Sequence, residues 1–381
     1  MWLIFFIYWG ALASSFPYMS VYLESRGLSG SQIGILNSMR SFLTFFSGMV
    51  LALVADVTRK HRLVFYISLL GAAISLLLFP AVNHFYAFLP VVFLYSVFNL
   101  PNNPILDEIA LAELDNPEEY GRIRVGGSIG WAVMSLVSGF LVERFVVGYR
   151  LTFFVHLSLY IVLFILNLRM SEFKVSNIEA ENRIQFSDLR SLGRIPEIVA
   201  LIFVTLIWGM AQSGISGFLF LHIQNLGGNA RLMGISMASI IVGEVVIFSV
   251  SGELQKKIGG KSMMLLAFIV QVIWFTGLSV IRSAEVIPVF QLFGGASFAL
   301  MQAGSVAYVD QTVPRSIGTT AQAVRGGMMT GIGIGTGTFF AGLVYESSGS
   351  AALFRSMAVM ASIGLVGALI LFNFFRKKKT V

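Results

Sequence analysis

The chain lacks cysteine altogether, and charged residues make up only 12% of its 381 positions. Without cysteine there is no disulfide framework and no thiol chemistry. Soluble domains carry about 25% charged residues, whereas 56% of this chain is hydrophobic. Such an apolar surface needs lipid as its solvent. The composition therefore predicts a membrane protein and argues against a soluble domain.

The net charge of +7 does not indicate a nucleic-acid partner, because the basic residues lie in loops at the ends of hydrophobic segments. The first hydrophobic segment, 2–23, also differs from a secretory signal peptide. No positive residue precedes it, and it is too long for the apolar core of a signal. We therefore expect it to be the first transmembrane helix.

Helices that cross a bilayer need about 20 apolar residues, and short polar breaks separate twelve such segments here. The predicted helices are 2–23, 33–54, 63–82, 86–112, 122–142, 150–168, 197–221, 232–254, 262–281, 287–309, 322–344 and 351–375. The one long break, 170–196, is rich in charge and predicts a cytoplasmic linker. The sequence thus predicts an all-α membrane protein with two six-helix pseudo-symmetric bundles, 1–169 and 197–381.

The distribution of basic residues predicts the orientation of the helices. With the N-terminus in the cytoplasm, every lysine falls inside, and the outside loops hold only Arg26, Arg144, Arg150, Arg231, Arg282 and Arg355. Cytoplasmic loops of membrane proteins carry an excess of lysine and arginine. We therefore expect both termini in the cytoplasm.

The chain repeats itself at a spacing of about 200 residues. The spacing drifts in order from 199 to 203 over the pairs Trp9/Trp208, Gly27/Gly227, Gly34/Gly234, Arg124/Arg325 and Gly139/Gly342. Both copies begin on the same side of the membrane, so this is a parallel repeat about an axis along the membrane normal.

Several segments resemble the major facilitator family. Ala52-Leu-Val-Ala-Asp56-Val-Thr-Arg59-Lys60 resembles the facilitator loop motif G-x-L-A-D-R-x-G-R-R, with Ala52 and Arg59 in place of two glycines. Tyr120–Ala132, and Gly243-Glu244 with Ile258–Lys261, resemble helices 5 and 8 of the lactose permease type, the oligosaccharide–proton symporters. Three further segments resemble the phenylpropionate permease family: Met39–Leu43, Pro104–Asp107 and Gln322–Val324.

This resemblance implies a proton-coupled uptake transporter for a small organic solute, working by alternating access in a bacterial cytoplasmic membrane. Arg124, Trp131 and Glu244 favour a sugar or glycoside, Arg40 favours an aromatic carboxylate, and a nucleoside fits both sets. Drug efflux by antiport is an alternative that the 34 phenylalanines permit. We expect no enzyme activity, cofactor or metal, and a monomer whose partners are its solute, protons and lipids.

Charged residues inside the predicted helices indicate function, because burying a charge in hydrocarbon is costly. Glu244 lies roughly 18 Å into its helix, near the midplane of a ~30 Å core, where burial favours the protonated carboxyl. We predict that Glu244 binds substrate and carries protons; a buried structural pair is the alternative. Arg40 binds a substrate carboxylate, pairs with Glu244, or extends outward to the membrane surface.

Polar residues on helices 4 and 5 form a second candidate group. Asn99, Asn103 and Asp107 share one helix face, as do Arg124 and Trp131. A guanidinium binds paired hydroxyls or a carboxylate, and an indole stacks on a sugar or an aromatic ring. The resemblance implies that Arg124 and Trp131 bind solute and that Asp107 pairs with Arg124, with Glu108 as its competitor. The alternatives are a membrane anchor for Arg124 and simple packing for Trp131.

The remaining predictions concern lining, coupling and gating. Secondary lining is expected from Ser14, Ser15, Tyr18, Trp208, Gln212, Ser216, Gln302, Val306 and Asp310. Proton coupling is assigned to Glu244 and Asp107, because the helix 10 stretch 290–298 lacks both histidine and glutamate; uniport is the alternative. Asp56, Arg325 and Lys256 form a cytoplasmic gate, or are plain solvated charges. His156 and His222 are expected to be structural, and the glycines of 326–342 to serve close helix packing.

Overall fold

The structure is a computed structural model that describes residues 1–43, 61–99, 106–107, 110, 114, 120–168 and 191–378. These residues form helices joined by short turns, and no strand occurs among them. The predicted all-α fold class is confirmed. Asp56 with its loop motif, Asn103, Glu108 and linker residues 170–190 lie outside the described residues.

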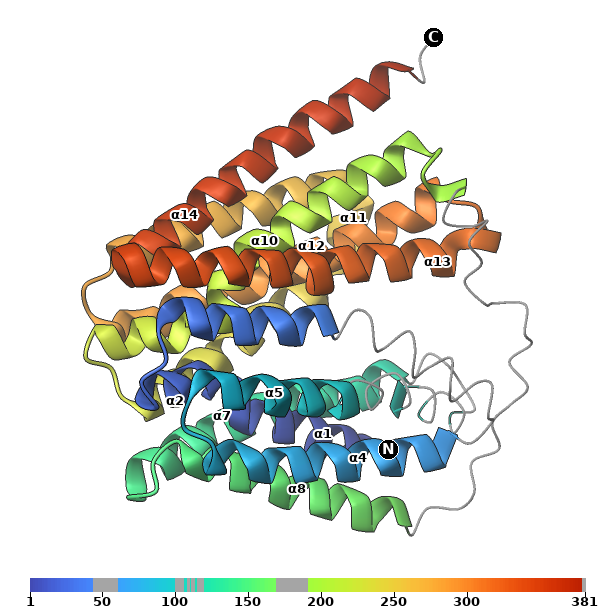
Figure 1. The fold of residues 1–381 in the computed structure, drawn as a ribbon. Helices are drawn as coiled ribbons and strands as arrows, with labels where there is room; N and C mark the ends of the chain where they lie inside the picture. Colours follow the sequence, from blue (N-terminus) through green and yellow to red (C-terminus); the bar gives the residue numbers. More distant parts are fainter. Residues whose placement is uncertain are drawn as a thin grey trace. The chain divides into compact units, whose positions relative to one another are not determined.

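Described helices occur within each of the first six predicted segments (Figure 1), although those at 33–54 and 86–112 are described only in part. They are α1 (Trp2–Ser15) with α2 (Met19–Ser25), an unlabelled helix over 30–43, α4 (His61–Leu78) with the short η1 (Phe79–Ala81), α5 (Phe85–Asn99), α7 (Tyr120–Arg144) and α8 (Arg150–Leu168). Helix α1 packs against α7 and α8, and α4 packs against α5 and α8.

The second part of the chain is helical throughout, and two of its helices continue through a kink. Its helices are α10 (Pro196–Asn225), α11 (Ala230–Val280), η4 (Ala284–Val286), α12 (Ile287–Thr312), α13 (Arg315–Gly326), the π-helical η5 (Gly327–Gly333) and α14 (Ile334–Lys378). A straight helix of the 51 residues of α11 would be about 75 Å long, more than twice a ~30 Å bilayer core. Gly259 (φ 76°) interrupts α11 between the predicted helices 232–254 and 262–281. Gly349 (φ 78°) interrupts α14, and the predicted helix 322–344 before it runs through α13, η5 and the start of α14.

The chain divides into two compact units. Unit 1 comprises Met1–Ile178 and Ile223–Ala238, and unit 2 comprises Glu179–His222 and Ser239–Val381. The segment Ile223–Ala238 belongs to the second sequence repeat but packs within unit 1. The division into bundles at 169 and 197 stays a prediction.

Polar contacts and close backbone approach hold Ile223–Ala238 within unit 1. Arg231 pairs with Glu143 at 3.5 Å, and Gln224 donates a hydrogen bond to Glu24 at 3.0 Å. Gly234 lies so near the carbonyl oxygen of Ser135 that a Cβ would approach it to 2.5 Å.

The 200-residue repeat is visible in the backbone of two equivalent turns. Gly27 and Gly227 both adopt φ 80°. In each turn the next amide, Leu28 or Gly228, bonds the carbonyl five residues back, at 3.2 and 2.8 Å. This is the Schellman end of a helix, which needs a left-handed residue and so favours glycine.

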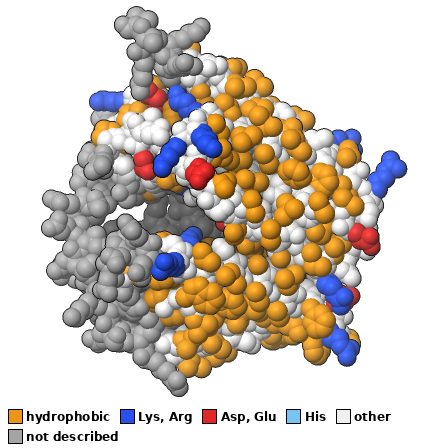
Figure 2. Space-filling model, turned by 180° about the vertical axis from the view of Figure 1, so that it is seen from behind, with side chains coloured by type: hydrophobic (Ala, Val, Ile, Leu, Met, Phe, Trp, Pro, Cys, Tyr) orange, Lys and Arg blue, Asp and Glu red, His pale blue; other side chains and the backbone are white. Residues whose placement is uncertain are grey.

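The helices expose apolar side chains in the manner of a membrane protein. Seven described helical stretches are long and apolar enough to cross a bilayer. Ile74 in unit 1 is 61% exposed, and Val366 in unit 2 is 54% exposed. Figure 2 shows a broad band of hydrophobic side chains, with charged ones mainly toward its two sides. Such a surface is stable only in contact with lipid.

Helix packing in unit 1 predicts a difference between two glycines of α7. A Cβ at Gly130 would fall against the carbonyl oxygen of Phe6, whereas a Cβ at Gly121 meets no atom within 4 Å. We expect Gly130→Ala to destabilise the protein by about 1–3 kcal/mol, because the α1–α7 crossing cannot widen without losing packing. Gly121→Ala should change stability by less than about 1 kcal/mol. Thermal unfolding in detergent measures both, and equal melting temperatures for the two variants would contradict the packing described.

Candidate functional site

The first transmembrane helix is broken near its middle. Helix α1 ends at Ser15 and α2 begins at Met19, and Pro17 between them has no N–H to continue the helical hydrogen bonds. Broken helices in transporters place polar groups at the centre of the membrane. Here the Ser15 hydroxyl shares a 2.6 Å hydrogen bond with Nδ1 of His156 on α8.

Aromatic rings surround that histidine and form what we call the histidine cluster: Phe16, Tyr95, His156 and Tyr160. His156 and Tyr160 meet edge to face at 4.4 Å, and Phe16 meets Tyr95 in the same way at 5.6 Å. Tyr160 donates a hydrogen bond to Asn99, one of the residues predicted to share a helix face with Asp107. His156 is completely buried.

Arg40 extends over this cluster. Its guanidinium carbon lies 4.5 Å from the centroid of the Phe16 ring, within cation–π distance. The predicted substrate residue Arg40 therefore faces aromatic side chains of unit 1. Glu244 belongs to unit 2, so an Arg40–Glu244 pair stays a prediction.

A second group, the arginine cluster, consists of Asp107, Tyr120, Arg124, Trp9 and Trp131. Arg124 pairs with Asp107 at 3.1 Å, and the Tyr120 hydroxyl donates to the same carboxylate oxygen at 2.7 Å. The Arg124 guanidinium carbon lies 5.4 Å from the Trp9 ring centroid, and the Trp9 and Trp131 rings lie 6.1 Å apart. The sequence-predicted residues Asp107, Arg124 and Trp131 are thus brought together.

The arginine cluster remains accessible to a solute. The Arg124 side chain is 44% exposed and that of Asp107 is 28% exposed. Their charges offset each other, while the carboxylate can accept and the guanidinium can donate further hydrogen bonds. Beside them lie two indole rings. This set of groups can bind neighbouring hydroxyls and stack against a ring.

Tyr8 links the two clusters within unit 1. Its ring stacks on Tyr160 at 6.4 Å with an interplanar angle of 7°, and it meets Trp9 edge to face at 5.7 Å. Polar and aromatic side chains therefore run without interruption from Arg124 to Arg40. Sequence reasoning missed Tyr8, Trp9, Tyr95, Tyr120 and Tyr160 as site residues. Trp9 carried a signal as one member of a repeat pair, and Tyr120 carried one as the first residue of the segment that resembles helix 5 of the lactose permease type.

In unit 2 two of the predicted lining residues, Trp208 and Gln212, form hydrogen bonds with side chains of neighbouring helices. The Trp208 indole is buried and donates to the Ser297 hydroxyl at 3.2 Å. Gln212 accepts a hydrogen bond from Gln271 at 3.3 Å. Glu244 is half-buried on α11, where Gly295 of α12 approaches its backbone closely.

Arg325 is buried on α13, with only 6% of its surface exposed. It donates to Ser305 at 2.9 Å, to Gln322 at 2.9 Å and to Gln302 at 3.2 Å. Within the described part of the chain these direct partners are all neutral. Gln302, a predicted substrate residue, thus accepts a hydrogen bond from Arg325 through its side-chain oxygen.

The other two members of the predicted gate are Asp56 and Lys256. The predicted partner of Arg325, Asp56, lies outside the described residues, so that pair stays a prediction. Lys256 is exposed on α11. No group of three histidine or acidic side chains that could hold a metal occurs among the described residues.

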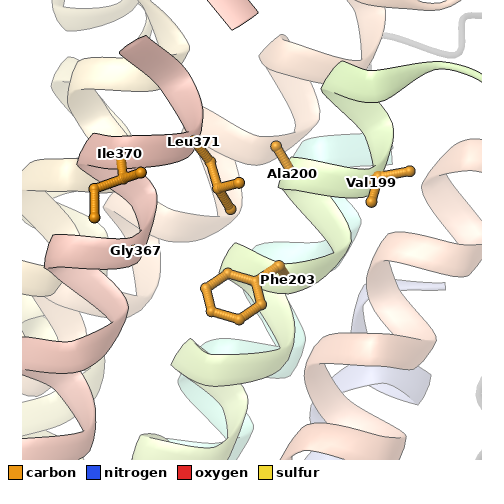
Figure 3. Close-up of a pocket in the computed structure, with 6 residues that line it drawn as sticks. All are labelled: Val199, Ala200, Phe203, Gly367, Ile370 and Leu371. Atoms are coloured by element: carbon orange, nitrogen blue, oxygen red, sulfur yellow. The ribbon is translucent and has the colours of Figure 1, made fainter. Parts of the chain in front are cut away.

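A groove of about 370 Å³ lies between α10 and α14 of unit 2 (Figure 3). It is lined by Val199, Ala200, Phe203, Gly367, Ile370 and Leu371. None of these side chains has a hydrogen-bonding atom, so the groove does not suit a polar solute.

Comparisons with known proteins agree with this architecture. The model of the MFS_1 like family matches residues 1–356. Maltose permease of Geobacillus stearothermophilus is 24% identical over 99% of this chain and 94% of its own length. The multidrug resistance protein MdtG of Citrobacter koseri is also 24% identical, over 99% of this chain and 94% of its own length. A probable 3-phenylpropionic acid transporter of Escherichia coli K12 is 24% identical over 94% of this chain and 93% of its own.

Among solved structures, the nucleoside transporter NupG matches with a TM-score of 0.85. The match covers 98% of both chains at 18% identity. A likeness at this level of identity shows a common fold.

The Ser15–His156 contact predicts unequal effects of two neighbouring buried serines. Ser15→Ala leaves Nδ1 of a fully buried histidine without its partner, which should cost about 1–3 kcal/mol. Ser14 bonds only the Ala11 carbonyl of its own helix, at 2.7 Å, so Ser14→Ala should cost less than about 1 kcal/mol. Melting temperatures of the two variants provide the measurement. A larger loss for Ser14→Ala would show that the broken helix does not depend on His156.

Proposed function

Because the chain belongs to the MFS_1 like family of major facilitator proteins, we propose that it takes up a nucleoside or a glycoside in symport with protons. Its family and fold make it a multi-pass membrane transporter and not an enzyme. The proposal concerns what is carried, in which direction, and with which ion.

The arginine cluster carries this proposal. A sugar or ribose presents neighbouring hydroxyls, which suit an exposed Arg124–Asp107 pair at 3.1 Å. The Trp9 and Trp131 rings beside the pair suit the base of a nucleoside or the C–H face of a sugar. Two of the similar proteins are named for maltose and for nucleosides, solutes of these classes.

The histidine cluster favours a second candidate, an aromatic carboxylate. The Arg40 guanidinium beside the Phe16 ring offers a charge for a carboxylate and an aromatic surface for a ring. Another similar protein is named as a probable 3-phenylpropionic acid transporter. Drug efflux, suggested by the name of MdtG, is an outcome that the same transport assay can detect.

We further propose that the protein works as a monomer in a bacterial cytoplasmic membrane, with both termini in the cytoplasm and lipids around it. The inside-facing excess of lysine supports this orientation. Opening alternately to the two sides requires contacts that form and break. The Glu143–Arg231 pair and the predicted Asp56–Arg325 pair are the candidates for such contacts.

Transport by the purified protein in liposomes tests the substrate. With an inward proton gradient, labelled uridine and labelled galactosides should accumulate. Arg124→Gln should lower the ratio kcat/KM by about 10- to 100-fold, because it removes a charged hydrogen-bond donor. Arg122→Gln is the matched control, since Arg122 is exposed on the same helix two residues away, and it should transport normally.

Two other outcomes of this assay would change the conclusion. Accumulation of arylpropionates that Arg40→Gln abolishes and Arg124→Gln spares would move the substrate to the aromatic acids. Gradient-driven movement of dyes and drugs out of the vesicles would indicate efflux.

Proton coupling gives a separate prediction for the carboxylates. Asp107→Asn keeps an oxygen that accepts from Tyr120 and Arg124 but can no longer bind and release a proton. We expect this variant to exchange solute across the membrane while losing accumulation driven by the proton gradient. Glu244→Gln tests the second predicted carrier in the same assay, and Glu253→Gln, exposed on α11, serves as the control. If both variants accumulate solute like the wild type, neither carboxylate couples transport to protons.

A further inference from the structure

A crossing of two helices joins the two copies of the sequence repeat within unit 1. Ser135 and Gly139 lie four residues apart on one face of α7, and Ala230 and Gly234 have the same spacing on α11. A Cβ at Gly139 would fall against the carbonyl oxygen of Ala230, and one at Gly234 would lie 2.5 Å from that of Ser135. Small residues at this spacing allow transmembrane helices to approach closely. We call this contact the α7–α11 crossing.

Tyr18 holds both helices of the crossing. Its side chain is completely buried, and its hydroxyl donates to the Ser135 carbonyl at 2.9 Å and lies 3.5 Å from the Ala230 carbonyl. A phenolic hydroxyl carries one proton, so it binds the two helices from a single position between them. Gly139 leaves the space for it, because a Cβ there would lie 2.8 Å from the hydroxyl oxygen.

Tyr18 also connects the crossing to the break in the first transmembrane helix. It is the N-cap residue of α2 and follows Phe16 and Pro17 in the turn between α1 and α2. Phe16 belongs to the histidine cluster and lies 4.5 Å from the Arg40 guanidinium. The Phe16 carbonyl accepts the Met19 N–H at 3.2 Å, and proline fixes its own φ, so the turn is stiff. A displacement of Phe16 that shifts this turn therefore also shifts Tyr18.

The α7–α11 crossing is also able to separate. The Ser135 hydroxyl is completely buried and, within the described part of the chain, has no hydrogen-bond partner. Such a hydroxyl costs free energy that is recovered when water reaches it. The polar contacts around the crossing are weak, because Glu143 lies 3.5 Å from Arg231 and 3.3 Å from Asn229 and all three are exposed. A single buried hydroxyl can therefore shift the balance between the formed and the separated crossing.

We propose that Tyr18 is a positioning residue that couples the histidine cluster to the α7–α11 crossing. In the structure its hydroxyl holds the crossing together. A solute that displaces Phe16 shifts the turn, draws the hydroxyl away from the Ser135 carbonyl and allows the crossing to separate. The inference rests on the proposed function, because opening alternately to the two sides requires contacts that form and break, but it does not depend on which solute is carried.

Double electron–electron resonance on the full-length protein tests this coupling without any solute. The chain has no cysteine, so spin labels attached at Val146→Cys and Asn225→Cys are the only ones present. Both positions are exposed, Val146 in the turn after α7 and Asn225 at the end of α10. A short label distance reports the formed crossing, and a longer one reports the separated crossing. Tyr18→Phe should raise the ratio of long to short distances about three- to tenfold, the effect of one lost hydrogen bond.

Phe16→Leu supplies the displacement that a solute would cause. It should raise the same ratio in the labelled protein but add nothing in Tyr18→Phe, because both changes act through one hydroxyl. The control is Phe65→Leu on α4, a fully buried phenylalanine outside both clusters, which should leave the ratio unchanged. Equal effects of Phe16→Leu with and without Tyr18→Phe would overturn the coupling.

A second variant keeps the test decisive if Tyr18→Phe fails to fold. Ser135→Ala removes the unpartnered hydroxyl and retains the carbonyl that Tyr18 binds, so it should lower the ratio. An unchanged ratio in folded Tyr18→Phe would overturn the proposal, as would an unchanged or raised ratio in Ser135→Ala. If these ratios change as expected while no nucleoside or glycoside accumulates in liposomes, the coupling stands and the proposed solute is wrong.

Discussion

The cost of placing charge in hydrocarbon governs the interior of this protein. A charged side chain inside a transmembrane bundle persists only when opposite charge or hydrogen bonds surround it. Asp107 and Arg124 meet this demand together, with Tyr120 as a third partner. Arg325 meets it with hydrogen bonds to neutral groups. The difference matters for function, because a paired and accessible carboxylate can bind both a hydroxyl and a proton, whereas neutral amides cannot take up a proton.

The same constraint shapes the backbone. In lipid every backbone group needs a partner, so a broken helix survives only where neighbouring helices compensate. The break between Ser15 and Met19 lies against α8 through the Ser15–His156 hydrogen bond. It also places Phe16 beneath Arg40. His156 therefore supports the helix break that places Phe16 in the histidine cluster. The histidine cluster forms one end of the row of aromatic side chains in unit 1, and the arginine cluster forms the other end.

Sequence alone predicted the helices well, because hydrophobic length is a local property set by bilayer thickness. It also predicted the repeat that appears at Gly27 and Gly227, since a left-handed helix end requires glycine. Arg124, Asp107 and Trp131 were found because polar residues are rare in such helices. Tyr8 and Tyr160 were missed because aromatic residues face lipid as readily as the interior. Only the rotation of each helix decides between the two, and that rotation depends on packing with distant parts of the chain.

The central claim is that solute binds at the Arg124–Asp107 pair beside the two indoles. Ligand-dependent thermal unfolding of the purified protein tests it most directly, because a ligand at 100 times its Kd stabilises the native state by about 2.7 kcal/mol. The account predicts that nucleosides or glycosides raise the melting temperature of the wild type and of Arg40→Gln, but not of Arg124→Gln. A melting temperature that rises only with arylpropionates, and does so equally in Arg124→Gln, would contradict it.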